Sequence, residues 1–154
     1  MLTQLLRNLG LARHLGEPVI VVSGLPRSGT SMMMNMLTAA ELEVVSDRVR
    51  VADEDNPKGY FEDERVKDLE RNPDRAWLRD CRGKVVKIVS FLLKDLPDDN
   101  RYKVIFMRRD LGEVIASQNK MLERRNEERG SGDMNEDEKM IRLYETHLRK
   151  IDFL

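Results

Sequence analysis

Apolar residues along this chain recur with two spacings, one typical of strands and the other typical of helices. Runs rich in β-branched and aromatic residues, which predict short buried strands, occupy positions 19–23, 84–90 and 102–107, with a weaker run at 42–45. Helical spacing is found at positions 30–40, 64–71, 112–125 and 136–154. Because strands and helices alternate along the chain, we expect an α/β fold with three layers (α/β/α) and a mostly parallel sheet.

Three further segments do not fit this alternation. Residues 1–16 combine six leucines with arginine and histidine, and the segment is too short and too charged for a membrane span or a secretory signal. It predicts a short amphipathic helix. Residues 53–63 contain Pro57 and Gly59 and predict a loop. Residues 123–139 are mostly charged around a Gly-Ser-Gly sequence, which predicts a mobile excursion between two helices that could close over a binding site as a lid.

Length and charge restrict the classes of protein to which the chain can belong. With 154 residues the chain has about the length of one domain, which we expect to span residues 1–154. The net charge is −1, so we expect neither nucleic acid nor a membrane surface as a partner. Cys81 is the only cysteine, which excludes an internal disulfide and favours a reducing, cytoplasmic location.

A glycine-rich segment, Gly-Leu-Pro-Arg-Ser-Gly-Thr-Ser at 24–31, stands between the first predicted strand and the first predicted helix. Glycines at such a turn let backbone N–H groups converge on an anion, and the dipole of the following helix stabilises the negative charge. ATP-binding loops require a lysine where this chain has Thr30, and a Mg²⁺-binding hydroxyl where it has Ser31. Arg27 supplies a cation inside the loop instead, suited to two oxygens of one phosphate or sulfate group. The alternative is a tight turn whose arginine is merely solvated.

A second cationic site is predicted where the strand at 102–107 ends in Arg108, Arg109 and Asp110. Ligands of an open parallel sheet bind beyond the carboxyl ends of its strands, so we expect Arg109 to share one rim with Arg27. A Mg²⁺-dependent kinase more usually carries an acidic residue at such a strand end, whereas two arginines suit a second phosphate. We interpret Asp110 as a helix N-cap. The alternative is that both arginines are ordinary surface charges.

These two segments together resemble the sulfotransferases that use 3′-phosphoadenosine-5′-phosphosulfate (PAPS), in particular the bacterial type. The resemblance is carried by Pro-Arg-Ser-Gly-Thr-Ser at 26–31 and by Arg109 followed by Ser117. It implies a P-loop NTPase-like fold, PAPS as co-substrate and no bound metal. The implied contacts to the donor are Arg27, Ser28, Gly29, Thr30 and Ser31 on the 5′-phosphosulfate and Arg109 and Ser117 on the 3′-phosphate.

The segment 85–97 is similar to a family segment in which a lysine closes a strand and a histidine follows two residues later. Lys87 occupies the lysine position, where it would neutralise charge on the moving sulfuryl group, and Val89 occupies the histidine position. Since some family members use a carboxylate as the base, we predict Glu62 for that role. The predicted catalytic residues are therefore Arg27, Lys87 and Glu62. The other acidic candidates around the family-like phrase Asn-Pro-Lys-Gly-Tyr-Phe-Glu-Asp are Asp53, Glu54, Asp55 and Asp63, whereas His14 and His147 are expected to pack or to face solvent.

The resemblance also implies an acceptor, which would be a hydroxyl or amine of a small molecule or a glycan. Family members continue with a further strand and a basic C-terminal loop, so we expect this chain to lack the C-terminal portion. Two other functions stay open. One is a nucleotide or small-molecule kinase of the P-loop fold, and the other is a non-catalytic nucleotide-binding or assembly module.

Overall fold

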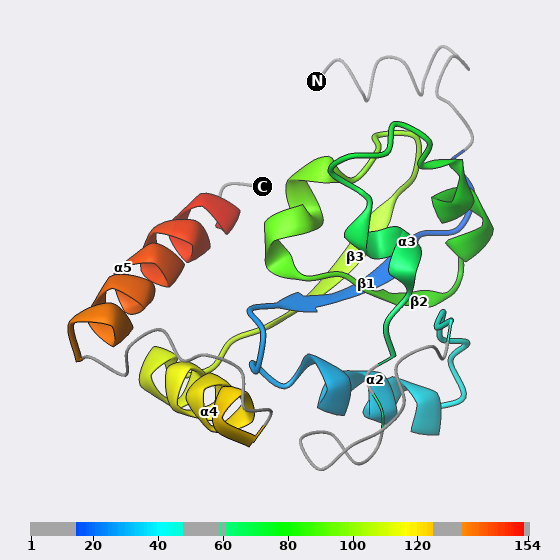
Figure 1. Cartoon of the computed structure of the whole chain (residues 1–154). Coiled ribbons are helices and arrows are strands. Elements are labelled where there is room, and N and C mark those ends of the chain that lie inside the picture. The colour runs from blue at the N-terminus through cyan, green and yellow to red at the C-terminus, as the bar shows by residue number, and fades with distance from the viewer. Residues whose placement is uncertain (1–14, 48–58, 60, 125–133, 153–154) are drawn as a thin grey trace.

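The computed structural model describes residues 15–47, 59, 61–124 and 134–152 of the chain (Figure 1). Its elements in chain order are β1 (Val19–Gly24), α2 (Thr30–Ala39), α3 (Glu64–Lys67), η1 (Ala76–Cys81), β2 (Val85–Lys87), η2 (Ser90–Asp95), β3 (Tyr102–Met107), α4 (Leu111–Arg124) and α5 (Met134–Ile151). The elements η1 and η2 are 3₁₀ helices. The predicted amphipathic helix at 1–16 lies outside the described residues, apart from its last two positions.

Three strands form one parallel sheet in the order β2-β1-β3. The central strand β1 pairs with β2 through Ile20↔Val85 and with β3 through Ile20↔Lys103. Since β1 comes first in the chain, each parallel pairing requires a crossover, and the intervening helices supply it. The α/β class and the parallel sheet are thus confirmed.

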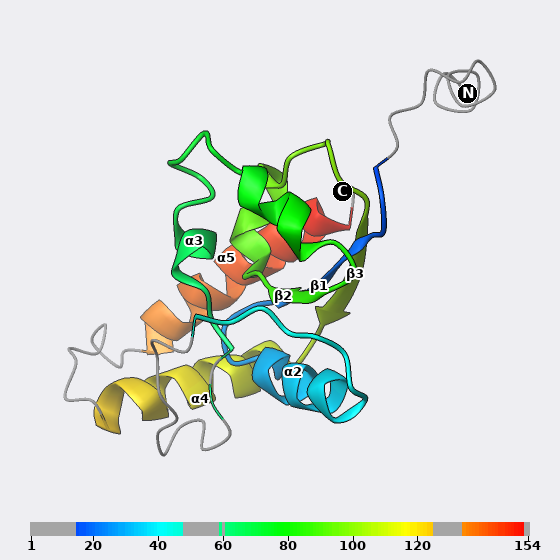
Figure 2. The same ribbon diagram turned by 90° about the vertical axis from the view of Figure 1, so that its right-hand side faces the viewer.

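Both faces of this sheet are covered, as the alternation along β1 requires. Val19 and Val21 point to one face, where they pack with Leu69 and Leu78 of the segment that contains α3 and η1. Val22 points to the other face and packs against Met34 of α2. Figures 1 and 2 show α2 on one side of the sheet and the short helices α3, η1 and η2 on the other. Strands buried on both faces explain why their sequences read as continuous apolar runs.

The helices α4 and α5 form a separate layer of packing beside the sheet (Figure 1). Val114 and Ile115 of α4 and Tyr144 of α5 enclose Leu25, the first residue after β1. The hydroxyl of Tyr144 donates a hydrogen bond to Oε1 of Gln118, at 3.1 Å. This packing fixes the start of α4 next to the end of β1.

Several predicted boundaries differ from the structure. The strands at 19–23 and 102–107 are confirmed, but the run at 84–90 is strand only over β2 and then turns into η2. The run at 42–45 contributes a single bridge, Val44↔Val85. The predicted excursion over 123–139 overlaps two helices, since α4 continues to Arg124 and α5 begins at Met134, and its middle lies outside the described residues. Charged residues on a helix face that meets solvent are compatible with helix, and composition alone does not distinguish the two.

Other predictions concern single residues and long segments. Trp77 lies in η1 and packs against the cluster of Val19 and Val21, with the guanidinium of Arg65 4.5 Å from its ring centroid. The tryptophan therefore anchors its helix to the core. Most of the predicted loop at 53–63 lies outside the described residues. Within the part of the chain that is described, no helix is long and apolar enough to cross a membrane.

Candidate functional site

A pocket of about 540 Å³ lies where the three strands end. Its lining comes from the loop after β1 (residues 24–27 and 29–32), from the end of β2 and the start of η2 (87–89 and 92), from the α3 region (62, 63, 66 and 67), and from Arg109, Ser117 and Met121. The carboxyl edge of an open parallel sheet is where such folds bind ligands, and this volume is within the range of small-molecule sites. Eight of the nine predicted site residues line this one pocket; Ser28 does not.

The loop at 24–31 has the backbone shape of an anion-binding turn. Arg27 and Gly29 both have left-handed backbone angles, with φ of 66° and 98°. Gly29 is the N-cap residue of α2, and the first turn of α2 contains no acidic side chain. Successive N–H groups in such a loop face a common centre, and the positive end of the helix dipole adds to their field. A non-glycine residue held at positive φ stores strain, which is typical of functional sites.

Two arginines converge on this loop from different elements. Nε of Arg27 donates to the Ser117 hydroxyl on α4, at 3.0 Å. Nη1 of Arg109 donates to the backbone carbonyl oxygen of Arg27, at 3.3 Å, while its Nε pairs with Glu113 at 2.8 Å. One cationic group is therefore formed by Arg27, Arg109 and Ser117. In sequence, Arg109 and Ser117 lie 82 and 90 residues after Arg27.

Ser28 has a different position from the other predicted donor contacts. Its side chain is buried, and its hydroxyl and its backbone N–H both donate to the carbonyl oxygen of Leu25, at 2.6 and 3.2 Å. These two bonds close the turn on itself. Ser28 therefore shapes the loop, and a direct contact of its hydroxyl with a ligand stays a prediction.

Lys87 reaches the loop from the end of β2. Its ammonium donates to the Ser31 hydroxyl at 3.0 Å and lies 3.9 Å from Oε1 of Glu62. The side chains of Lys87 and Glu62 are 16% and 23% exposed. A weakly solvated cation can stabilise developing negative charge, and a weakly solvated carboxylate beside it can accept a proton. Lys87 and Glu62, the two other predicted catalytic residues, thus lie together with the loop.

Asp63, the next residue, is not equivalent to Glu62. It caps α3 through the backbone N–H of Arg65 at 3.0 Å and also accepts from Nε and Nη2 of Arg65, at 2.9 and 2.7 Å. These bonds hold the pKa of the Asp63 carboxyl below its usual value, so it is a poor proton acceptor. Among the other carboxylates named from the sequence, those at 53–55 lie outside the described residues.

His147 lies in a packing contact away from the pocket. Its ring stacks on Phe91 with centroids 3.8 Å apart, and its Nε2 is 2.9 Å from the Ser90 hydroxyl. Burial lowers the pKa of His147. This histidine joins α5 to η2, as the packing interpretation predicts, while His14 is outside the described residues.

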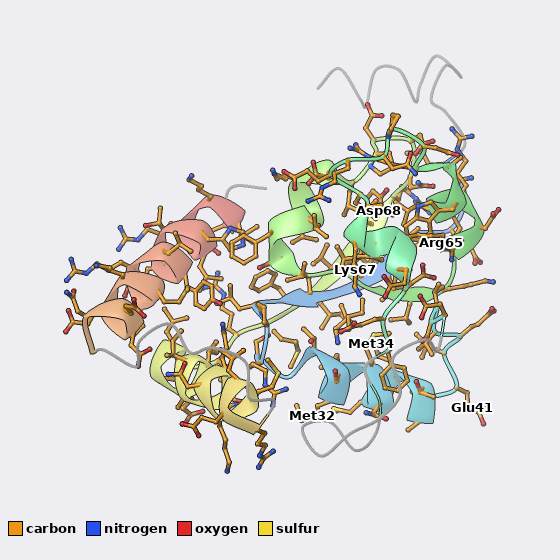
Figure 3. All side chains as sticks on the ribbon, viewed as in Figure 1. Met32, Met34, Glu41, Arg65, Lys67 and Asp68 are labelled. Carbon is orange, nitrogen blue, oxygen red and sulfur yellow. The ribbon has the colours of Figure 1, made fainter. Side chains whose placement is uncertain are left out.

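Sequence reasoning missed part of the lining. Met34 of α2 packs on the sheet, but Met32 of the same helix is 57% exposed and lines the pocket (Figure 3). Met121, Val66 and Leu92 also line it without having been predicted. Met32 and Met121 had a signal: each lies about one helical turn after a predicted site residue, Gly29 and Ser117 respectively. Within the described residues, no cluster of three or more histidine, cysteine or acidic side chains has a geometry that could hold a metal ion.

Comparison of this chain with models of protein families, with curated proteins and with solved structures gave no match.

Proposed function

We propose that this protein is a sulfotransferase that moves a sulfuryl group from PAPS to an acceptor hydroxyl or amine. The observation that carries the proposal is the convergence of Arg27, Arg109 and Ser117 at one end of the pocket with Lys87 and Ser31 next to them. PAPS has two anionic groups, one on each side of its ribose. A sheet edge of the P-loop type with two cationic side chains, Arg27 and Arg109, matches that distribution of charge.

On this proposal the loop and the start of α2 hold the 5′-phosphosulfate. The backbone N–H groups, the Arg27 guanidinium and the hydroxyls of Thr30 and Ser31 are the donors. The 3′-phosphate lies on the β3 side, where Arg109 is 41% exposed and Ser117 lines the same pocket. When the donor binds, the guanidinium of Arg27 exchanges its neutral partner, the Ser117 hydroxyl, for charged oxygens of the 5′-phosphosulfate, and hydrogen bonds to charged groups are the stronger ones.

The transfer then follows from Glu62 and Lys87. The Glu62 carboxylate takes the proton of the acceptor hydroxyl while the acceptor oxygen forms a bond to sulfur. The bond from sulfur to the bridging oxygen of the donor breaks in line, and its electron pair leaves with adenosine 3′,5′-bisphosphate. Lys87 and Arg27 stabilise the negative charge that develops on that bridging oxygen. If the acceptor is an amine, the same carboxylate removes the proton from nitrogen.

One contact favours this proposal over a P-loop kinase. In kinases and ATPases with a Walker loop, the hydroxyl at the position of Ser31 binds Mg²⁺. Here the ammonium of Lys87 lies 3.0 Å from that hydroxyl, so a positive charge from the protein already occupies this place. Like charges disfavour a metal ion there, and a metal-independent donor fits better.

Calorimetric titration tests the proposal against both alternatives. We expect adenosine 3′,5′-bisphosphate to bind without metal, and more tightly than adenosine 5′-monophosphate or ATP with Mg²⁺. Preference for ATP with Mg²⁺ would support the kinase instead, and no nucleotide binding at all would support a non-catalytic module.

Neighbouring arginines supply a matched control for this titration. Arg109→Ala removes the predicted 3′-phosphate contact and should weaken the bisphosphate about 10- to 100-fold, the value of a charge-assisted hydrogen bond, without affecting adenosine 5′-monophosphate. Arg108→Ala removes the same side chain one position earlier, where it pairs with Asp152, the residue that directly follows α5, and should change neither affinity. Equal losses in both variants would contradict the assignment of the 3′-phosphate to Arg109.

Glu62→Gln and Lys87→Met test the transfer itself. With PAPS and an accepted substrate, Glu62→Gln should lower kcat about 10²- to 10⁴-fold with nearly unchanged affinity for the bisphosphate. Lys87→Met should lower kcat as well, because charge on the leaving group is no longer neutralised. Full activity in Glu62→Gln would remove this carboxylate from the reaction.

A further inference from the structure

The order of the strands divides the pocket into two sides. The loop of Arg27 follows the central strand β1, Arg109 follows β3 on one side, and Lys87 closes β2 on the other. Neighbouring strands are about 4.8 Å apart, so the ends of β2 and β3 are separated by about 10 Å. If the nucleotide occupies the loop and the β3 side, the acceptor must enter on the β2 side, next to Lys87 and Glu62.

This β2 side of the pocket has an apolar wall. Its lining includes Val66 from α3, Ile88 and Val89 after β2, and Leu92 from η2. Val66 and Ile88 belong to the buried core, so their positions are fixed by packing. Val89 and Leu92 are only half-buried and remain accessible from the pocket. Val89 and Leu92 therefore supply most of the accessible contact area of this wall, and apolar side chains offer little hydrogen bonding.

The polar side chains on the same side are engaged within the protein. Asp63 accepts three hydrogen bonds from Arg65, and Lys67 pairs with Glu64 at 2.7 Å. Lys87 and Glu62 are reserved for the reacting oxygen on the mechanism above. A sugar ring carries several hydroxyls, and each one that leaves water without a new partner costs free energy. The described residues of this wall offer such an acceptor few partners.

We propose that the β2 side of the pocket is an acceptor subsite for alcohols with an apolar body, with Val89 and Leu92 as the specificity-determining residues. This inference rests on the proposed function and narrows its acceptor from any hydroxyl or amine to a hydroxyl on an apolar frame. The apolar frame packs against Val66, Val89 and Leu92, and the hydroxyl points to Glu62. On this proposal Val89 contacts the acceptor at the position where the sulfotransferases that this sequence resembles have a histidine.

This inference can be tested with two alcohols that each carry a hydroxymethyl group on a six-membered ring. Cyclohexylmethanol has an apolar ring, and methyl β-D-glucopyranoside has a polar one. Each is titrated into the full chain, with and without saturating adenosine 3′,5′-bisphosphate, and binding is followed by calorimetry. We expect cyclohexylmethanol to bind at least about tenfold more tightly, which is the discrimination that a hydrophobic pocket gives for small apolar differences.

Variants with a matched control locate the binding. Val89→Thr keeps the shape of the side chain and replaces one methyl group by a hydroxyl, and Leu92→Ala removes apolar contact area. Each should weaken the binding of cyclohexylmethanol about tenfold. Val104→Thr makes the same exchange on β3, where the side chain is 47% exposed and does not line the pocket, and should have no effect. All three variants should bind the bisphosphate as the unmodified chain does, which also shows that they fold.

The outcomes separate this inference from the proposed function. Equal or tighter binding of the glucopyranoside overturns the inference, as does a loss of cyclohexylmethanol binding that is the same in Val104→Thr as in Val89→Thr. If the bisphosphate fails to bind but cyclohexylmethanol binds with the expected sensitivity to Val89 and Leu92, the apolar subsite is supported and the sulfotransferase proposal fails. If the bisphosphate binds and neither alcohol prefers the pocket, the sulfotransferase proposal survives and the acceptor assignment fails.

Discussion

Replacement of Gly24 by alanine tests whether the phosphate loop depends on a close approach between two strands. A Cβ atom at this position would lie 2.4 Å from the Ser28 hydroxyl oxygen and 2.7 Å from the carbonyl oxygen of Met107. Ser28 can rotate only by giving up its 2.6 Å hydrogen bond to Leu25, at a cost of about 1 kcal/mol. Met107 is the register partner of Gly24 in β3 and cannot move without disturbing the sheet, which adds about 1–3 kcal/mol of overpacking.

We therefore expect Gly24→Ala to lower the free energy of unfolding by about 3 kcal/mol, with some additional backbone strain from its φ of 155°. With an m value of about 1.5 kcal/mol/M, the midpoint of urea unfolding falls by about 2 M. The matched control is Gly59→Ala. Gly59 has φ of 93°, and no atom of the described residues lies within 4 Å of its Cβ position, so we expect this substitution to cost only the strain of positive φ, about 1–2 kcal/mol.

The assay is urea unfolding followed by circular dichroism, with bisphosphate affinity measured on the same samples. Because the loop must shift to admit the extra carbon, Gly24→Ala should also weaken the nucleotide. A Gly24→Ala midpoint equal to or above that of Gly59→Ala would refute the reasoning, since the close contacts would then cost nothing beyond backbone strain.

Three further predictions concern titratable groups. Asp63→Asn removes the ion pair with Arg65. Since the pKa of Asp63 is lowered in the folded state, the unmodified chain should have its full stability advantage over this variant at pH 7, and the advantage should shrink as the pH falls below about 4. Urea midpoints of the two proteins that change in parallel with pH would contradict this. His147→Phe retains the stack on Phe91. Because burial lowers the pKa of His147, the unmodified chain should lose stability relative to this variant between pH 7 and 5, which thermal unfolding midpoints measure. A difference between the two midpoints that stays constant over this pH range would argue against the prediction. Burial raises the pKa of the Cys81 thiol to about 11. At pH 8 the thiol should therefore react with a disulfide reagent only as fast as the folded protein unfolds locally to expose it. A rapid reaction of the folded chain would show that the thiol is accessible and would contradict the prediction.

The parts of the site that could be predicted from the sequence are those determined by local patterns. The strands at 19–23 and 102–107 are apolar runs bounded by turn residues, and the loop at 24–31 carries its glycines at the positions that have positive φ. The general rule that ligands bind at the carboxyl edge of a parallel sheet then brings Arg27 and Arg109 together. No pairing of individual residues is needed for that inference.

The parts that could not be predicted depend on how distant segments pack. The hydrogen bond from Lys87 to the Ser31 hydroxyl joins residues that are 56 positions apart. The hydrogen bonds from Arg65 to Asp63 depend on where the four-residue helix α3 begins. Whether Met32 packs or lines a pocket is decided by its angular position on α2 relative to the sheet, which composition does not specify. Helix length in charged segments is equally a tertiary property, as α4 and α5 show by extending into residues that look like a loop.

The way in which the pocket holds its cations explains why it is suited to an anion before one arrives. Arg27, Arg109 and Lys87 follow three adjacent parallel strands or their loops, so their charges are held within about 10 Å along one edge. Arg27 contacts a hydroxyl and Arg109 an exposed carboxylate, and neither is a deeply buried counter-charge whose removal would leave a charge without a partner. Lys87 contacts the Ser31 hydroxyl and lies 3.9 Å from the weakly solvated carboxylate of Glu62. An incoming anion can therefore replace a weak partner with a stronger one at little cost, while the repulsion among the three cations is relieved at the same time. Since both effects require negative charge on the ligand, neutral molecules gain neither, and for this reason we propose a phosphorylated or sulfated donor at this edge of the sheet.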